Sequence, residues 1–233
     1  MTWVKICGMT NLEDALAAVE AGADAVGFVF YEKSPRNVSV EVAREIVEKL
    51  PENVEKVGVF VGETAETVRE ITEKAELTMA QTYPNFRDPL SIPNDQFLER
   101  ALARVIVALP ANQLWGEESD NPDVITGFRA SNMFRDRIAA VLLDSGASDR
   151  PGGTGQKFDW QSVVPLTELM GRIRLRLIVA GGLTPGSVEG AMRALTPWGV
   201  DVASGVEASP GKKDPGKVRA FVKAVRDADR KTG

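Results

Sequence analysis

Residues 2–30 read TWVKICGMTNLEDALAAVEAGADAVGFVF and form one strand–helix–strand pattern. Two apolar runs, TWVKIC (2–7) and DAVGFVF (24–30), flank a segment whose apolar residues recur at helical spacing. These residues are Leu12, Ala15, Leu16 and Val19. Apolar strands that are connected by helices form parallel sheets whose outer face the helices cover. The stretch therefore predicts an α/β fold.

The same unit repeats along the chain. Strands are expected at 2–7, 24–30, 55–61, 77–81, 103–109, 138–144, 175–181 and 199–205. Helices are expected at 12–23, 39–50, 64–75, 94–103, 122–136, 159–170, 184–196 and 214–230. Eight such units in 233 residues predict a single-domain (β/α)8 TIM barrel over residues 1–233, with an active site at the C-terminal ends of the strands. A doubly wound open sheet usually has fewer units, and its G-x-G-x-x-G motif is missing from the first turn.

The composition argues against several classes of partner. The net charge is −5 and no run is rich in Lys or Arg, so a nucleic-acid partner is not expected. No apolar run is long enough to span a membrane. The start of the chain lacks the basic-then-apolar pattern of a signal peptide, and we expect a cytoplasmic protein.

The chain has one cysteine and no histidine. A single cysteine allows no internal disulfide. The absence of histidine excludes a Ser-His-Asp or Cys-His catalytic pair and every zinc site that contains histidine. Acid–base chemistry must therefore come from Asp, Glu, Cys, Lys or Tyr.

Three reactive side chains fall at or near predicted strand ends. Cys7 ends the first strand, Asp144 ends the sixth, and Asp201 lies in the eighth. Closure of a barrel would bring these strand ends around one mouth. Each residue also has a structural interpretation: Cys7 as a small core hydrophobe, Asp144 as a loop cap, and Asp201 as a partner of Lys5 inside the barrel.

Two glycine-containing loops and one arginine are candidate anion-binding groups. AGGL (180–183) follows the seventh strand and ASG (203–205) lies at the end of the eighth. In (β/α)8 barrels, the loops after strands seven and eight frequently bind phosphate through backbone N–H groups. Arg36, in the loop after the second strand, suits a carboxylate because its guanidinium binds in a bidentate manner, although loop arginines are often only solvated.

Several of these segments together resemble the phosphoribosylanthranilate isomerases of tryptophan biosynthesis. The resemblance covers residues 2–75 and 138–223. Its motifs are VKICGMTN (4–11), GADAVGFVFYEKSPRNVS (22–39), KVGVFV (56–61), LLDS (142–145), GGTGQKFDW (152–160), AGGLTPGSV (180–188) and GVDVASGVEASPGKKDPGKVRAF (199–221).

The resemblance implies an Amadori rearrangement of N-(5-phosphoribosyl)anthranilate to 1-(2-carboxyphenylamino)-1-deoxyribulose 5-phosphate, without a metal or organic cofactor. It implies that Cys7 is the general base and Asp144 the general acid. Arg36 would bind the anthranilate carboxylate, and Asp201 would orient the substrate. The implied phosphate-binding residues are Gly181, Gly182, Ser204 and Gly205. The base needs a thiol pKa below its usual value and the acid a carboxyl pKa above it.

The chain departs from the family pattern in its middle part. QTYPN (81–85) stands where the family usually has QLHG, so that Gln81 is kept and the histidine is lost. A lysine that is common at the end of the fifth strand is absent, and Ala203 replaces the first of two serines. The motifs above do not extend the resemblance into residues 82–137.

Two other functions remain open at this point. The first is another aldose–ketose isomerase on the same barrel, of the histidine-biosynthesis type, but that enzyme uses two aspartates and Cys7 argues against it. The second is a catalytically silent phosphate-binding barrel, which the joint presence of Cys7, Asp144 and Arg36 disfavours. The expected partner is a phosphorylated small molecule, and the protein is expected to be a monomer or a homodimer.

Overall fold

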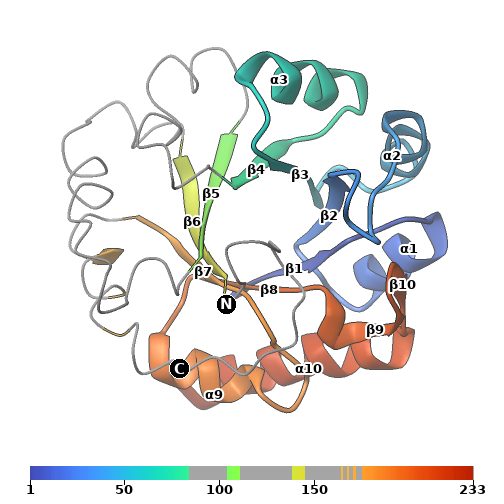
Figure 1. Cartoon of the computed structure of the whole chain (residues 1–233). Helices are drawn as coiled ribbons and strands as arrows, with labels where there is room; N and C mark the ends of the chain where they lie inside the picture. Colours follow the sequence, from blue (N-terminus) through green and yellow to red (C-terminus); the bar gives the residue numbers. More distant parts are fainter. Residues whose placement is uncertain are drawn as a thin grey trace.

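The computed structural model describes residues 1–83, 104–110, 138–144, 164, 167, 170–171 and 175–232. Eight parallel strands close into a barrel in chain order, which confirms the predicted fold class (Figure 1). The strands are β1 (Trp3–Cys7), β2 (Ala25–Phe30), β3 (Glu55–Val61), β4 (Met79–Tyr83), β5 (Arg104–Pro110), β6 (Ile138–Asp144), β7 (Leu177–Val179) and β8 (Gly199–Val202). Strand β1 pairs with both β2 and β8 and thereby closes the barrel.

Five helices of the described residues lie outside the barrel (Figure 1). They are α1 (Leu12–Glu20), α2 (Val40–Val47), α3 (Ala65–Lys74), α9 (Val188–Leu195) and α10 (Pro215–Thr232). The first three begin at capping residues, Asn11, Ser39 and Thr64, whose side chains accept a backbone N–H from three residues further on. The helices expected at 94–103 and 122–136 lie outside the described residues, as does most of 159–170.

The apolar side chains form two layers because strand residues alternate between the two faces of the barrel. The barrel interior contains apolar residues from several strands, among them Val57, Ile106 and Leu142. A larger cluster packs between the strands and the helices and includes Val4 and Ile6 of β1. Lys5 and Cys7 alternate with these two residues along β1. Their side chains therefore face the interior of the barrel.

Strand β4 lies two residues later than the sequence predicts. The expected strand was 77–81, whereas β4 runs from Met79 to Tyr83. The chain leaves α3 through a turn in which Glu76 has a φ of 53°, and the N–H of Leu77 still bonds to the carbonyl of Thr72. Gln81 and Tyr83 are two residues apart on one strand, so both side chains face the same side of the barrel.

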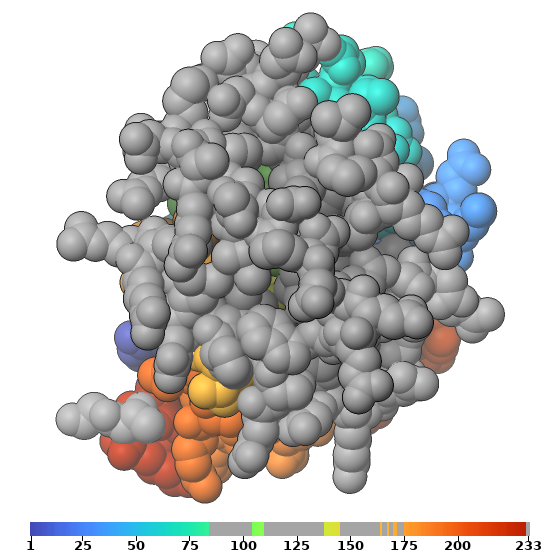
Figure 2. Space-filling view, turned by 60° about the vertical axis from the view of Figure 1, so that its left-hand side comes forward, coloured from blue at the N-terminus to red at the C-terminus, as the bar shows by residue number. Residues whose placement is uncertain are grey.

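The chain between β8 and α10 contains elements that the sequence did not predict. A short 3-10 helix, η3 (Ser204–Val206), precedes an antiparallel pair, β9 (Glu207–Ser209) and β10 (Lys212–Lys213). Helices α9 and α10 then lie side by side, joined by an ion pair between Lys231 and Glu189 (orange to red in Figure 2). In the part of the chain that the structure describes, no helix is long and apolar enough to cross a membrane.

Candidate active site

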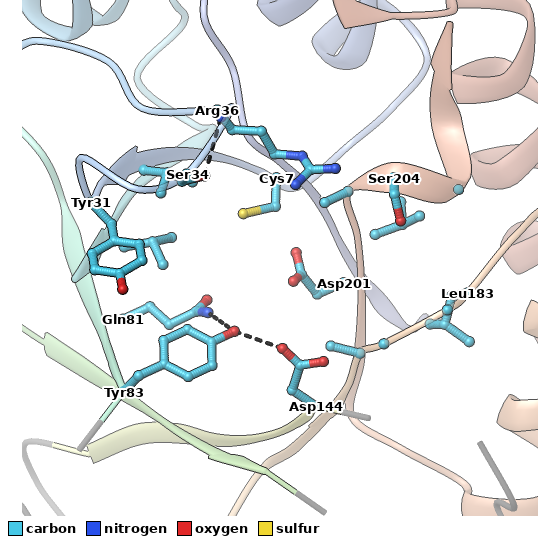
Figure 3. Close-up of a pocket in the computed structure, with 18 of the residues that line it drawn as sticks. Cys7, Tyr31, Ser34, Arg36, Gln81, Tyr83, Asp144, Leu183, Asp201 and Ser204 are labelled. Carbon is cyan, nitrogen blue, oxygen red and sulfur yellow. Dashed lines mark hydrogen bonds between the residues drawn. The ribbon is translucent and has the colours of Figure 1, made fainter. Parts of the chain in front are cut away.

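A pocket with an empty volume of about 670 Å³, which includes open solvent, lies at the C-terminal ends of the strands (Figure 3). Its lining comes from β1, β2, β3, β4, β6 and β8 and from the loops after β2, β7 and β8. All eight candidate residues from the sequence line it: Cys7, Arg36, Asp144, Gly181, Gly182, Asp201, Ser204 and Gly205. The structure therefore brings together groups that are up to about 200 positions apart in the chain.

Asp201 forms a buried ion pair with Lys5. The two residues are in register on adjacent strands, and Lys5 Nζ lies 2.8 Å from Asp201 Oδ1. This confirms the structural interpretation of Asp201, although the same carboxylate also lines the pocket. Burial alone would lower the pKa of Lys5, but the negative groups Asp201 and Cys7 outweigh it and raise that pKa. Lys5 is therefore a buried cation beside Asp201, which lines the pocket.

Cys7 lies two residues after Lys5 and packs against Val29 and Val59. Burial raises the pKa of its thiol, and the attraction of Lys5 and Lys213 opposes this only in part. The prediction of a lowered thiol pKa is wrong for this structure, because desolvation of the thiolate exceeds the attraction of the nearby cations. A Cβ at Gly27 would lie 2.8 Å from the Cys7 Sγ, so a glycine at this position leaves room for the thiol.

Asp144, at the end of β6, is bound to a tyrosine from β4, two strands away in the barrel. The hydroxyl of Tyr83 donates to Asp144 Oδ2 at 2.9 Å, and Gln81 Nε2 donates to the Tyr83 hydroxyl at 3.3 Å (Figure 3). Burial and the neighbouring carboxylate of Asp144 raise the pKa of Tyr83 well above its usual value. Sequence reasoning missed Tyr83 because it ended the fourth strand at Gln81. The two-residue alternation from Gln81 was the signal that could have identified it.

Arg36 is held by an internal carboxylate at the edge of the pocket. Its Nε and Nη2 donate to the two oxygens of Glu207 at 2.8 and 2.7 Å. Lys213 Nζ also donates to Glu207, at 2.9 Å, and the N–H of Gly211 adds a bond at 3.3 Å. Burial alone would raise the pKa of Glu207, but Arg36 and Lys213 lower it. Neither Glu207 nor Lys213 was identified from the sequence, although EASPGKKD (207–214) is rich in charge.

The glycine loops after β7 and β8 contact each other closely. Gly181 and Gly182 have φ angles of 85° and 63°, which L side chains rarely adopt. A Cβ at Gly205 would lie 1.8 Å from the carbonyl oxygen of Leu183, so only glycine fits there. The two loops contain no Lys or Arg. Any anion bound by these loops would therefore be held by backbone N–H groups and the Ser204 hydroxyl.

The helix after β7 begins later than expected. The prediction was 184–196, whereas α9 starts at Val188. Residues 184–187 form a turn in which the Ser187 hydroxyl accepts the N–H of Thr184 at 2.9 Å. Within the described residues, no cluster of three or more His, Cys, Asp or Glu could hold a metal ion.

Comparisons with known proteins agree on one family. Residues 4–86 and 113–224 match the family model of N-(5'-phosphoribosyl)anthranilate (PRA) isomerase. A curated relative from Geotalea uraniireducens, N-(5'-phosphoribosyl)anthranilate isomerase, is 40% identical over 97% of this chain and 99% of its own.

Solved structures show the same likeness. The phosphoribosylanthranilate isomerase of Thermotoga maritima is 36% identical, with a TM-score of 0.77 over 97% of this chain and 100% of its own. A structure of such an isomerase in complex with reduced 1-(o-carboxyphenylamino)-1-deoxyribulose 5-phosphate has a TM-score of 0.75 at 36% identity, over 97% and 100% of the two chains.

Proposed function

Because the chain belongs to the N-(5'-phosphoribosyl)anthranilate isomerase family, we propose that Cys7 and Asp144 perform the family reaction as base and acid. The protein isomerises N-(5'-phosphoribosyl)anthranilate to 1-(2-carboxyphenylamino)-1-deoxyribulose 5-phosphate, a step of tryptophan biosynthesis. The observation that carries the proposal is the convergence of a thiol, a carboxyl, an arginine and two glycine loops on one pocket.

The first step opens the ribose ring. Asp144 gives a proton to the ring oxygen, and the bond between C1 and that oxygen breaks with its electron pair going to oxygen. The lone pair of the anthranilate nitrogen forms a double bond to C1 and leaves an iminium ion. A carboxylic acid suits this step because the leaving oxygen would otherwise depart as an alkoxide.

The second step moves the double bond. The Cys7 thiolate takes the proton from C2, and that electron pair forms a C1–C2 double bond while the nitrogen becomes neutral. The resulting enolamine loses the proton of its C2 hydroxyl and gains one at C1, which gives the ketone. Protons gained and lost are equal, so the product is an isomer of the substrate and no redox cofactor is required.

The ends of the substrate are anions, and the pocket offers a different donor set to each. Glu207 occupies two of the five guanidinium N–H donors of Arg36, which leaves the Nη1 side for the anthranilate carboxylate. The loops at 180–183 and 203–205 supply backbone donors for the phosphate. Asp201 orients the ribose or the amine while paired with Lys5. The protein acts as a monomer or a homodimer, which sedimentation equilibrium distinguishes.

The test is an assay with phosphoribosylanthranilate, followed by the loss of its fluorescence. We expect turnover by the wild-type protein and a loss of about 10²–10⁴-fold in Asp144→Asn, which keeps the size of the side chain but carries no transferable acid proton. No turnover by the wild-type protein would favour a silent phosphate-binding barrel. Near-normal turnover by Asp144→Asn would disprove the assignment of the acid.

A further inference from the structure

A chain of two hydrogen bonds ends on the carboxyl group of Asp144. Gln81 Nε2 donates to the hydroxyl of Tyr83, and this hydroxyl donates to Asp144 Oδ2 at 2.9 Å (Figure 3). Gln81 is 1% exposed, and its Oε1 has no hydrogen-bond partner among the described residues. Its amide thus presents a donor, and not an acceptor, to Tyr83. The phenol proton is therefore directed to Asp144.

Tyr83 is also suited to remain a donor throughout the reaction. Burial and the carboxylate of Asp144 raise the pKa of its hydroxyl well above the usual value for tyrosine. The residue does not give up its own proton at neutral pH. It can only orient and stabilise the group to which it donates.

We propose that Tyr83 is a positioning residue for acid catalysis, which holds Asp144 Oδ2 as an acceptor and thereby places the transferable proton on Oδ1. The proposal rests on the acid role of Asp144 in the proposed function. In the protonated acid, Oδ2 is the carbonyl oxygen and accepts the phenol proton. When Oδ1 gives its proton to the ring oxygen, negative charge develops on both carboxyl oxygens. The bond from Tyr83 then becomes charge-assisted and stronger.

The geometry gives this bond two separate effects. It fixes the rotation of the carboxyl group, so that the proton faces the pocket in which the substrate lies. It also stabilises the carboxylate that forms in the transition state more than the acid that precedes it. The first effect raises turnover, and the second moves the ionisation of Asp144 to lower pH. A residue that merely packs against Asp144 would not shift the ionisation of its carboxyl group.

The test compares Tyr83→Phe with a matched control on the same strand. Tyr83→Phe removes one hydroxyl and keeps the ring. We expect kcat to fall by about 10-fold to 100-fold, which is part of the 10²–10⁴-fold that general acid catalysis contributes, while KM changes little. Thr82→Val is the control, because Thr82 faces the other side of β4 and its Oγ1 has no partner among the described residues. It should retain wild-type kinetics.

A pH profile of kcat/KM separates positioning from packing. In Tyr83→Phe, the inflection that belongs to Asp144 should move to higher pH, because loss of a donor disfavours the carboxylate. The inflection of Cys7 is measured independently, from the pH dependence of iodoacetamide alkylation, since the chain has only one thiol. This second inflection should stay in place in Tyr83→Phe. Circular dichroism and a thermal melt establish that both variants fold.

The outcomes distinguish this proposal from the function on which it rests. If Asp144→Asn is inactive but Tyr83→Phe keeps wild-type kcat and both inflections, then Tyr83 is not a positioning residue and the acid assignment survives. If Asp144→Asn is active, the assignment of Asp144 as the acid is disproved, and the role proposed for Tyr83 is disproved with it. A fall of kcat in Tyr83→Phe with unmoved inflections would also overturn the proposal, because it would indicate packing alone.

Discussion

The two sides of the pocket differ in charge. The side built by β1, β8, the loop after β2 and the β9–β10 pair contains three cations and two carboxylates around Cys7: Lys5, Arg36, Lys213, Asp201 and Glu207. On the side built by β4 and β6, the neutral hydroxyl of Tyr83 donates to Asp144, and Gln81 donates to that hydroxyl. The formal charge near the thiol is thus one positive unit in excess, and a thiolate would balance it.

This difference fits two groups that must work in opposite protonation states. A base is needed as an anion, and an excess cation favours the anion. An acid is needed in its neutral form, and the hydroxyl of Tyr83 is a neutral donor that orients the carboxyl group. The cations beside Cys7 and the neutral donor beside Asp144 therefore each favour the proposed role of their side. Burial still holds the pKa of Cys7 above its usual value. The cations therefore offset only part of the desolvation of the thiolate.

The largest expected effect is on the base side. Cys7→Ser should fold normally and lose nearly all activity, by roughly 10³-fold or more, because a hydroxyl is too weakly acidic to form the required anion at neutral pH. Steady-state kinetics with phosphoribosylanthranilate measures the loss, and circular dichroism checks the fold. A serine variant with near-normal turnover would make Cys7 a core residue and remove the contrast between the two sides.

The next effect concerns the phosphate end, which lies between the two sides. Gly182→Val should weaken the binding of inorganic phosphate and of product together, on the order of 10-fold or more, since a hydrogen bond to a charged group contributes ~1.5–3 kcal/mol. The side chain would occupy the space of the anion, and the φ of 63° disfavours a β-branched residue.

Isothermal titration with phosphate and with product measures the change. Gly186→Val is the matched control, because among the described residues a Cβ at Gly186 meets only Thr184 Oγ1, at 4.0 Å. It should bind both ligands as the wild-type protein does. Unchanged binding in Gly182→Val would place the phosphate elsewhere in the pocket.

A smaller effect is expected at Arg36, which binds a part of the substrate that does not react. Arg36→Ala should raise KM by about 10-fold and lower kcat less, because binding is lost equally in the ground state and the transition state. Arg36→Lys is the control that keeps the charge but loses the bidentate geometry. Its KM should lie between those of the wild-type protein and Arg36→Ala. If KM is unchanged in Arg36→Ala, the residue serves only to hold Glu207.

The sequence predicted the barrel because its strands are continuous apolar runs, and it placed Cys7 and Asp144 correctly at strand ends. It could not predict the bond between Tyr83 and Asp144, since that depends on where β4 ends and on how the barrel places the end of β4 relative to that of β6. The partner of Arg36 could not be predicted from the sequence either. Glu207 is 171 residues away in the chain, and the hairpin of β9 and β10 that carries it has no strong pattern of its own.

The smallest expected effect tests the contrast between the two sides most directly. Lys213 lowers the pKa of Cys7 by attraction, and it follows Lys5 among the cations that do so. Lys213→Met should therefore move the midpoint of Cys7 alkylation to higher pH, by less than about one unit, and Lys5→Met should move it further. The sign follows from the loss of a cation, which disfavours the thiolate, so that alkylation at a fixed neutral pH becomes slower. Tyr83→Phe, on the acid side, should leave this midpoint in place. If Tyr83→Phe moves the thiol midpoint as much as Lys213→Met does, the two sides titrate as one coupled system, and the separation of base and acid by local charge is wrong.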